Sequence, residues 1–289
     1  MIEYIAVQAN SCGVQLTTPI KQRYPMLIAQ LSDIHVRPKG VLYKGVADSN
    51  QMFSDAIKHL KHLDQRPDFV LLTGDLVDEG DPAEYSHLLE LLSELSIPYA
   101  VVMGNHDHRE NFRAAFSAHS YLPQSGPLHY CIDDYPVRIV VLDSCVTGED
   151  YGHIDAEGLS WLSAVLNEDA YKPTIIALHH PPIVSGIPYM DVYRYIDAEP
   201  LAKILRRSSN VEAVLCGHVH RSMAKRWAGT MVVTCPSTTT EIALQLKPDA
   251  EPQSYSGPPA CMLHLWHPES GLVSHTSYIG VYPGPYPFA

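Results

Sequence analysis

Polar side chains of the kinds that bind cations follow five separate apolar runs in this chain. In sequence order they are Asp33 and His35, Asp75, Asn105, His179 with His180, and His218 with His220. All of them offer oxygen or nitrogen and none offers sulfur, which favours iron, manganese, cobalt or catalytic zinc over a structural zinc site. They are too many for one ion and suit two ions that share a carboxylate. The residue types therefore predict a dinuclear metal site.

The first pair indicates how such a site could form. Asp33 and His35 stand two residues apart, directly after the run MLIAQL. If this run is a strand that continues as extended chain, both side chains point to the same face. One such ending is more often structural than functional. Five together favour a shared site, because carboxylates and imidazoles buried side by side are costly unless something binds them.

Alternating strands and helices are expected to position these residues. Apolar runs predict strands at 26–33, 68–75, 98–105, 137–144, 173–180, 211–218 and 229–237, and a hairpin at 261–280. Helical spacing and capping signals predict helices at 49–65, 81–95, 108–119, 155–168 and 198–208. This alternation indicates an α/β fold with helix-covered sheets, in which ligands bind at the carboxyl ends of the strands. A lid loop is expected at 181–200 and a mobile flap at 236–260.

Composition restricts the classes of partner. The chain has 289 residues, of which 46% are hydrophobic and 18% charged, which suits one large domain. Its net charge is -12 and no basic stripe is visible, so extended nucleic acid is not an expected partner. No apolar run reaches the roughly 18 residues of a membrane span, and the start of the chain lacks the features of a signal peptide. The six cysteines form no Cys-x-x-Cys pair, so we expect a reduced, cytoplasmic protein with no membrane partner.

The complete set of motifs resembles the calcineurin-like metallophosphoesterase superfamily. The matching blocks are Asp33-x-His35, Gly74-Asp75-x-x-Asp78, Gly104-Asn105-His106-Asp107, His179-His180-Pro181 and Gly217-His218-x-His220, within 26–235. A closer similarity, to bacterial glycerophosphodiesterases and class III cyclic-nucleotide phosphodiesterases, rests on LYKGVADSN, on RPDFVLLTGDLVDEGDPAEY and on HHPP with YMD downstream. The resemblance implies a four-layer α/β/β/α sandwich with the dinuclear site at the carboxyl edge of the strands.

The resemblance also implies how the chain is organised. A catalytic domain would occupy 25–235, after an N-terminal extension at 1–24. Residues 236–289 would supply a flap, strands and a tail that complete the domain or form an oligomer interface. Three histidines of the C-terminal hairpin could contact a neighbouring subunit: His264, His267 and His275. Members of the superfamily commonly associate, so we expect a homo-oligomer.

The resemblance further divides the ligands between two ions. One ion would take Asp33, His35, Asp75 and His220, and the other Asp75, Asn105, His179 and His218, so that Asp75 bridges them. His179 is preferred to His180 because the family's ligand stands two residues before the proline, and alternation along a strand sends His180 to the opposite face. Glycines before Asp75, Asn105 and His218 would let the backbone turn sharply and come close to the ions.

His106 is the expected catalytic residue beside these ligands. His106, oriented by Asp107, would donate to a phosphoryl oxygen or protonate the leaving group. Asp78 would contact the ligands without binding an ion itself. Asn105 and Tyr43 are expected to contact substrate, although core packing would explain Tyr43 equally well. Three residues of the lid loop are further candidates for the pocket: Met190, Tyr193 and Tyr195.

The expected activity is metal-dependent hydrolysis of small phosphodiesters, in which a metal-bridging hydroxide attacks phosphorus. Glycerophosphodiesters, 3′,5′-cyclic nucleotides and aryl phosphodiesters are the candidate substrates. The nearest alternative is a phosphomonoesterase or protein phosphatase, but these usually have Glu in place of Asp107 and several arginines, whereas Arg109 is the only arginine near the motif. A nuclease is disfavoured by the charge, and a non-catalytic scaffold by the complete ligand set.

Overall fold

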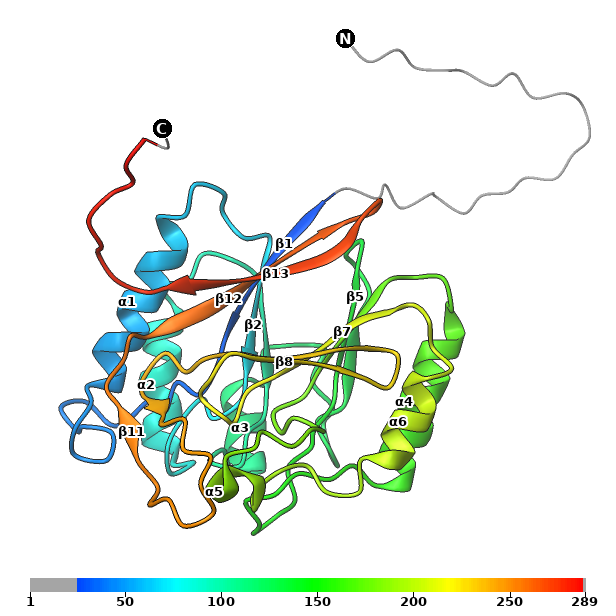
Figure 1. The fold of residues 1–289 in the computed structure, drawn as a ribbon, viewed down its shortest axis with the longest axis horizontal. Helices are drawn as coiled ribbons and strands as arrows, with labels where there is room; N and C mark the ends of the chain where they lie inside the picture. Colours follow the sequence, from blue (N-terminus) through cyan, green and yellow to red (C-terminus); the bar gives the residue numbers. More distant parts are fainter. Residues whose placement is uncertain (1–24, 288–289) are drawn as a thin grey trace, which may run out of the picture.

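Two β-sheets lie against each other at the centre of the molecule, and helices cover their outer faces. The computed structural model describes residues 25–287, so the expected extension at 1–24 lies outside the described residues. In Figure 1, α1 and α2 lie on one side of the strands and α4 and α6 on the other. This is the four-layer α/β/β/α arrangement that the family resemblance implies, and the expected fold class is confirmed.

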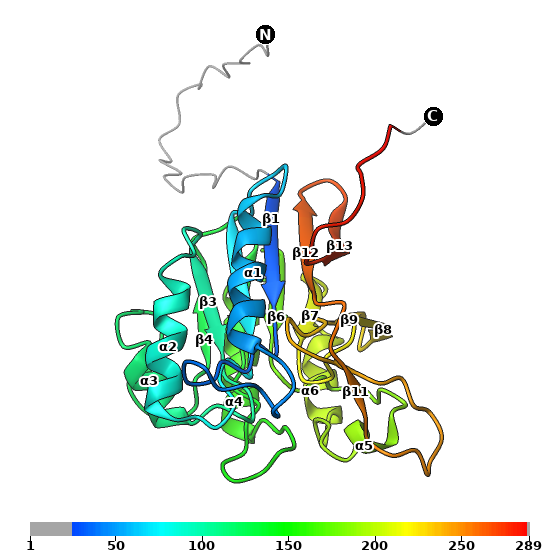
Figure 2. The ribbon, with the colours of Figure 1, turned by 90° about the vertical axis from the view of Figure 1, so that its left-hand side faces the viewer.

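The first sheet carries the first three motifs. Its order is β13-β12-β1-β2-β3, in which β1, β2 and β3 are parallel and β12 is antiparallel to β1. The strands are β1 Met26–Leu31, β2 Phe69–Thr73, β3 Tyr99–Val102, β12 Ala260–His267 and β13 Gly271–Tyr278. Figure 2 shows α1 Ser49–Lys61, α2 Pro82–Leu92 and α3 Arg109–Ala115 on the outer side of this sheet. Because parallel strands end at the same edge, the three motifs meet there.

The second sheet carries the two histidine motifs. Its order is β4-β5-β6-β7-β9-β8, with the antiparallel strands β4 and β8 at its edges. The strands are β4 Tyr130–Ile132, β5 Arg138–Val141, β6 Thr174–Ala177, β7 Val211–Cys216, β8 Met223–Trp227 and β9 Thr230–Thr234. The other elements are α4 Ala156–Glu168, the short α5 Pro188–Asp191, α6 Glu199–Leu205, and the ribbon of β10 Glu241–Ile242 and β11 Ser254–Tyr255.

The central strands of the second sheet are covered on both faces, which explains their continuous apolar runs. Along β6, Ile175 and Ala177 belong to the core shared with the first sheet, whereas Ile176 packs in the cluster beneath α4 and α6. A parallel strand covered on both faces needs apolar side chains at every position. Among residues 25–287, no helix is long and apolar enough to cross a membrane.

The C-terminal hairpin is part of the first sheet, because β12 pairs with β1 from Met26↔Trp266 to Gln30↔Met262. The expectation that His264 could contact another subunit is wrong. Its side chain is fully buried, with Nε2 at 3.0 Å from Gln30 Oε1 and Nδ1 at 2.8 Å from Ser274 Oγ.

The burial of His264 predicts that acid destabilises the fold. Burial lowers the pKa of His264 to about 3, against 6.5 in the unfolded chain. Below pH 6.5 this histidine is therefore protonated in the unfolded chain but stays neutral in the folded chain. Its contribution to the free energy of unfolding then falls by up to about 1.4 kcal/mol for each pH unit. We expect His264→Gln to lose less stability than the wild type between pH 7 and pH 5. Urea unfolding of both metal-free proteins measures this, and parallel pH profiles would contradict it.

Candidate metal centre

The structure brings together all seven expected ligands, and they come from both sheets. From the first sheet, Asp33 and His35 follow β1, Asp75 follows β2 and Asn105 follows β3; from the second, His179 follows β6, and His218 and His220 follow β7. The nitrogen and oxygen atoms of the six aspartates and histidines among them form overlapping clusters within 4.8 Å, which also include His106 and His180. Asn105 joins them through His218, since its Oδ1 is 3.1 Å from His218 Nδ1. The two sheets thus meet in one polar site at the carboxyl ends of their strands.

The first group of ligands surrounds a point between Asp33, His35 and His220. His35 Nε2 and His220 Nε2 are 3.2 Å apart, and His220 Nε2 is 3.4 Å from Asp33 Oδ1. His220 Nδ1 donates to Thr240 O at 2.8 Å, which leaves its Nε2 with a free lone pair. Burial lowers the pKa of both histidines to about 4, so both are in the neutral form that binds cations.

The second group lies between Asn105, His179 and His218. Asn105 Oδ1 is 3.1 Å from His218 Nδ1, and His179 Nε2 is 3.3 Å from Asp75 Oδ2. His179 Nδ1 donates to Thr73 O at 2.8 Å, which turns Nε2 toward Asp75. Within the described residues, Nε2 of His218 is buried without a hydrogen-bond partner, and Nε2 of His179 has only the charge contact with Asp75. Buried ring nitrogens of this kind fit a cation that their lone pairs could bind, because a buried polar atom without a partner destabilises the fold.

The charges of the site also favour a bound cation. Burial alone would raise the pKa of Asp75, but His179, His106 and His35 hold it well below its usual value. Burial would lower the pKa of His179, but Asp75 and Asp33 raise it to about 9. Without a cation, the two carboxylates favour a proton on His179, and a bound cation would take the place of that proton, so binding should release protons.

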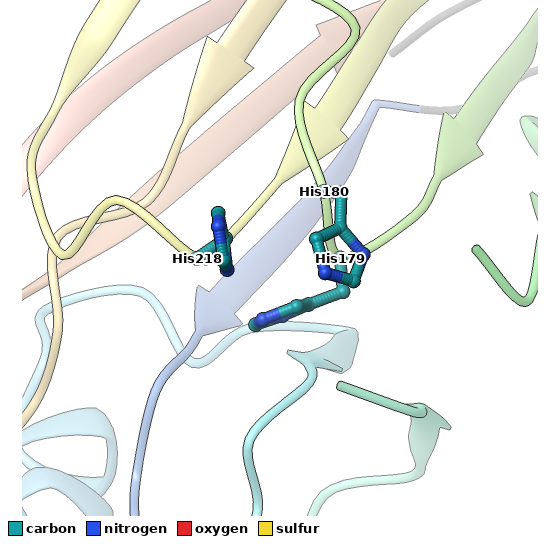
Figure 3. Close-up of side chains that lie close together, drawn as sticks. All are labelled: His179, His180 and His218. Carbon is teal, nitrogen blue, oxygen red and sulfur yellow. The ribbon is translucent and has the colours of Figure 1, made fainter. Parts of the chain in front are cut away.

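His180 lies close to His179 and His218, and Figure 3 shows the three rings together. Its ring nitrogens are occupied, because Nδ1 is 2.9 Å from Ser144 Oγ and Nε2 is 3.1 Å from Asp150 O. Burial lowers the pKa of His180 to about 3. The geometry favours His179 as the ligand, with His180 as a buried support beside it.

The backbone of the site is strained, and one expectation about it is wrong. β1 ends at Leu31, and Asp33 and His35 have φ of 52° and 50°, so they are not extended chain. Asp75, His218 and His220 also have φ between 49° and 71°. Left-handed non-glycine residues cost about 1–3 kcal/mol each and cluster at functional sites. Asp33 and His35 still converge, because Asp33 N donates to Gly74 O and His35 N to Asp75 O.

All three glycines that precede expected ligands fit the expected close approach of the backbone. A Cβ on Gly104 would collide with the backbone and carboxylate of Asp75, and a Cβ on Gly217 would collide with Ser32 Oγ. Gly74 also has a φ of 95°, and a Cβ there would collide with the His179 ring. No larger residue fits these positions without moving a ligand.

His106 is oriented by Asp78, and the expectation that Asp107 orients it is wrong. His106 Nδ1 lies 2.7 Å from Asp78 O and 3.4 Å from Asp78 Oδ1. Asp107 instead accepts hydrogen bonds from Gly104 N, Leu76 N and Tyr85 Oη, and so braces the turn that carries Asn105. Burial would lower the pKa of His106, but Asp75 and Asp78 raise it to about 10. Without bound cations, these two carboxylates therefore favour the protonated ring of His106 at neutral pH.

A cavity of about 480 Å³ opens above the metal centre. Asp75, Asn105, His106, His218 and His220 form its floor, and both expected mobile segments contribute walls. Tyr43 also lines it, stacked on the His35 ring at 4.5 Å. A second cavity of about 340 Å³ adjoins it, and both cavities are lined by Lys44 and His106.

Of the three lid-loop residues expected to line the pocket, two do so and one does not. Met190 and Tyr193 line the larger cavity. Tyr195 does not; it is buried, and its hydroxyl accepts a hydrogen bond from Ile154 N at 3.2 Å. The lid assignment of Tyr195 is wrong because this residue anchors the loop to the protein.

Sequence reasoning missed a row of buried hydroxyl groups beneath the first group of ligands. Ser237 Oγ donates to Asp33 O at 2.7 Å, and Thr239 Oγ1 donates to Ile34 O at 2.8 Å. Residues 237–240 are buried, so the expected flap at 236–260 does not include its first residues. The sequence signal that could have indicated this support is the run Ser-Thr-Thr-Thr at 237–240, whose hydroxyl groups can donate hydrogen bonds to nearby backbone carbonyl groups.

Comparisons with known proteins agree with this geometry. Residues 26–222 match the family described as Calcineurin-like phosphoesterase. A protein of Arcobacter nitrofigilis named "Probable glycerophosphodiester phosphodiesterase GpdQ" is 39% identical over 264 residues, which cover 91% of this chain and 97% of that protein. A cAMP/cGMP dual specificity phosphodiesterase of Mycobacterium tuberculosis is 34% identical over 217 residues, which cover 73% of this chain and 67% of that protein.

A solved structure supports the fold. The crystal structure of a dimetal phosphatase from Danio rerio superposes with a TM-score of 0.61 at 16% identity, over 88% of this chain and 99% of that one. The family match covers well over half of the sequence, and the motifs that carry it are the ones that meet at the metal centre. The chain belongs to the calcineurin-like phosphoesterase family.

Proposed function

We propose that this chain hydrolyses small phosphodiesters with two cations bound at the shared edge of its sheets. One cation would be held by Asp33, His35, Asp75 and His220, and the other by Asp75, Asn105, His179 and His218. Iron, manganese, zinc and cobalt all suit these donors. When bound, two such cations withdraw charge from the phosphate and lower the pKa of water towards neutrality.

His106 would supply a proton during the reaction. Its Nδ1 is engaged by Asp78, which leaves Nε2 free to donate, and His106 lines both cavities. Asp78 is itself held by Arg37 Nη1 at 2.9 Å, so the histidine has a fixed orientation. From this place His106 would donate to a phosphoryl oxygen or to the departing alkoxide. Asn105 and Tyr43 would contact the substrate from the floor and wall of the larger cavity.

The residues that line the larger cavity favour a phosphodiester over a phosphomonoester as the substrate. Lys44 is the only lysine or arginine among the described residues that line it. Arg109 is occupied, since Nε donates to Asp143 Oδ2 at 2.9 Å and Nη2 to Cys145 O at 2.8 Å. A monoester dianion is usually gripped by arginine, whereas a diester has one charge less and needs room for a second organic group. The part of the cavity that is lined by the apolar side chains of Ile187, Met190 and Ile242 would accommodate that group.

Glycerophosphodiesters and 3′,5′-cyclic nucleotides are the proposed natural substrate classes. The names of the Arcobacter nitrofigilis and Mycobacterium tuberculosis relatives support both. We further propose a cytoplasmic location, which the unpaired state of Cys131, Cys145, Cys216, Cys235 and Cys261 supports. Association into a homo-oligomer stays a prediction.

Rates on bis(p-nitrophenyl) phosphate and on p-nitrophenyl phosphate test this function. We expect the metal-free protein to be inactive, and Mn²⁺ or Co²⁺ to restore activity with a preference for the diester. A large preference for the monoester would make the chain a phosphomonoesterase. Bound cations without activity on either ester would favour a scaffold.

A further inference from the structure

A buried hydrogen-bond network crosses the two sheets beneath the metal centre. Gln30 of β1 is its central residue and has no exposed surface. Its Nε2 donates to Thr73 Oγ1 at 2.8 Å and to Cys216 O at 3.0 Å. Thr73 ends β2 in the same sheet, whereas Cys216 ends β7 in the other sheet. One side-chain amide therefore ties together three strands from both sheets.

The other end of the amide is fixed by the C-terminal hairpin. Gln30 Oε1 is 3.0 Å from His264 Nε2, and His264 Nδ1 is 2.8 Å from Ser274 Oγ. Since Cys216 O can only accept, the orientation of the amide is determined, and His264 must donate from Nε2. Thr73 Oγ1 donates its own proton to Leu31 O at 3.3 Å. Every group has a partner, so the network favours one arrangement.

The strand ends that Gln30 ties together lead directly to ligands. Thr73 is followed by Gly74 and Asp75, and Cys216 by Gly217 and His218. Thr73 O also accepts the hydrogen bond from His179 Nδ1. Both proposed cations take donors from both sheets. Asp75 and His218, which follow these two strand ends, are both assigned to the second cation, so its site depends most directly on how far apart the strand ends stand.

We propose that Gln30 is a positioning residue, which sets the separation between Asp75 and His218 and thereby the affinity for the second cation. This inference rests on the proposed function. The first group of ligands has its own support, since Ser237 Oγ holds Asp33 O and Thr240 O holds His220. The loss on removing Gln30 should be partial, because His218 N also donates to the Asp33 carboxylate at 3.0 Å.

Equilibrium titration of metal-free Gln30→Leu with Mn²⁺ or Co²⁺ tests the proposal. Leucine has a similar volume but no amide. We expect the affinity for the second cation to fall about 10- to 100-fold, the usual effect of outer contacts of a metal site, with a smaller change for the first. Excess cation should then restore much of the turnover. Unchanged affinities, or equal weakening of both cations, would overturn the proposal.

Two variants separate positioning from general loss of stability. His264→Leu leaves both donations of Gln30 in place, and we expect a lower Tm with both affinities kept. Arg138→Met removes a buried network at the far end of the second sheet, where Arg138 donates to Val165 O and Thr174 Oγ1. It should also lower Tm without weakening either cation. If either control weakens the second cation as Gln30→Leu does, the positioning role is refuted.

A matched pair at Thr73 keeps the test valid if Gln30→Leu does not fold. Thr73→Val removes the hydroxyl that accepts from Gln30, whereas Thr73→Ser retains it. We expect only the valine variant to lose affinity for the second cation, and equal behaviour of the two would overturn the proposal. A wild-type protein that binds no cation at all would instead refute the metal centre of the proposed function.

Discussion

Replacing Asp75 by alanine is expected to abolish binding of both cations and to lower turnover by at least about 10³-fold. The carboxylate stands between the two groups of ligands, with Oδ2 at 3.3 Å from His179 Nε2 and 3.9 Å from His35 Nε2. Its Oδ1 accepts from His106 N at 2.9 Å, so the same side chain also holds the turn that carries His106. Elemental analysis of bound metal and the rate on bis(p-nitrophenyl) phosphate measure the two effects.

Asp68→Ala provides a matched control at the opposite end of the same strand. Asp68 directly precedes β2, is exposed, and accepts a hydrogen bond from Leu27 N at 2.8 Å. This variant should keep two cations and wild-type turnover. Two cations bound per chain of the Asp75→Ala variant would show that Asp75 is not the bridge.

The strands and the edge of the site could be predicted because burial on both faces produces continuous apolar runs. The division into two sheets could not be predicted from those runs. In the first sheet, for example, the place beside β1 is taken by the distant strand β12, with Trp266 opposite Met26. No local pattern records a pairing between segments so far apart in the chain, and only the family resemblance implied the sandwich.

The ligand types could be predicted, but their backbone and supports could not. Alternation along an extended strand does not describe Asp33 and His35, because hydrogen bonds to Gly74 O and Asp75 O hold both in left-handed conformations. Such bonds form only after β1 and β2 pair. Distant contacts also decided the role of Asp107, which turns towards Tyr85 although it follows His106 in sequence.

The supports of the site are buried hydroxyl and amide groups whose types look unremarkable in a sequence. Residues 236–240 resemble a loop because serine and threonine are common in loops. In the fold two of them donate to the carbonyl groups of a strained turn, Ser237 to Asp33 O and Thr239 to Ile34 O. Gln30 stands as a single polar residue in an apolar strand, which gives a stronger signal, since a buried amide needs partners.

Replacing His106 by alanine is expected to leave both cations bound and to lower turnover by about 10²- to 10⁴-fold. No hydrogen bond of the His106 side chain goes to an expected ligand, since Nδ1 is engaged by Asp78 O. The loss therefore reflects the missing proton donor. Bound metal and kcat on bis(p-nitrophenyl) phosphate measure the two quantities. His119→Ala is the control, because His119 is half-buried against Tyr99 and lines neither cavity.

The choice of substrate then separates the two proton-donating roles of His106. If its Nε2 protonates the departing alkoxide, the loss in His106→Ala should be much larger for a glycerophosphodiester than for bis(p-nitrophenyl) phosphate, because p-nitrophenolate leaves without a proton. If Nε2 donates to a phosphoryl oxygen, both substrates should lose similar factors. We expect the first result, because His106 lines both cavities and so stands where an ester group would pass from one to the other. Loss of bound metal in this variant would instead place His106 among the ligands.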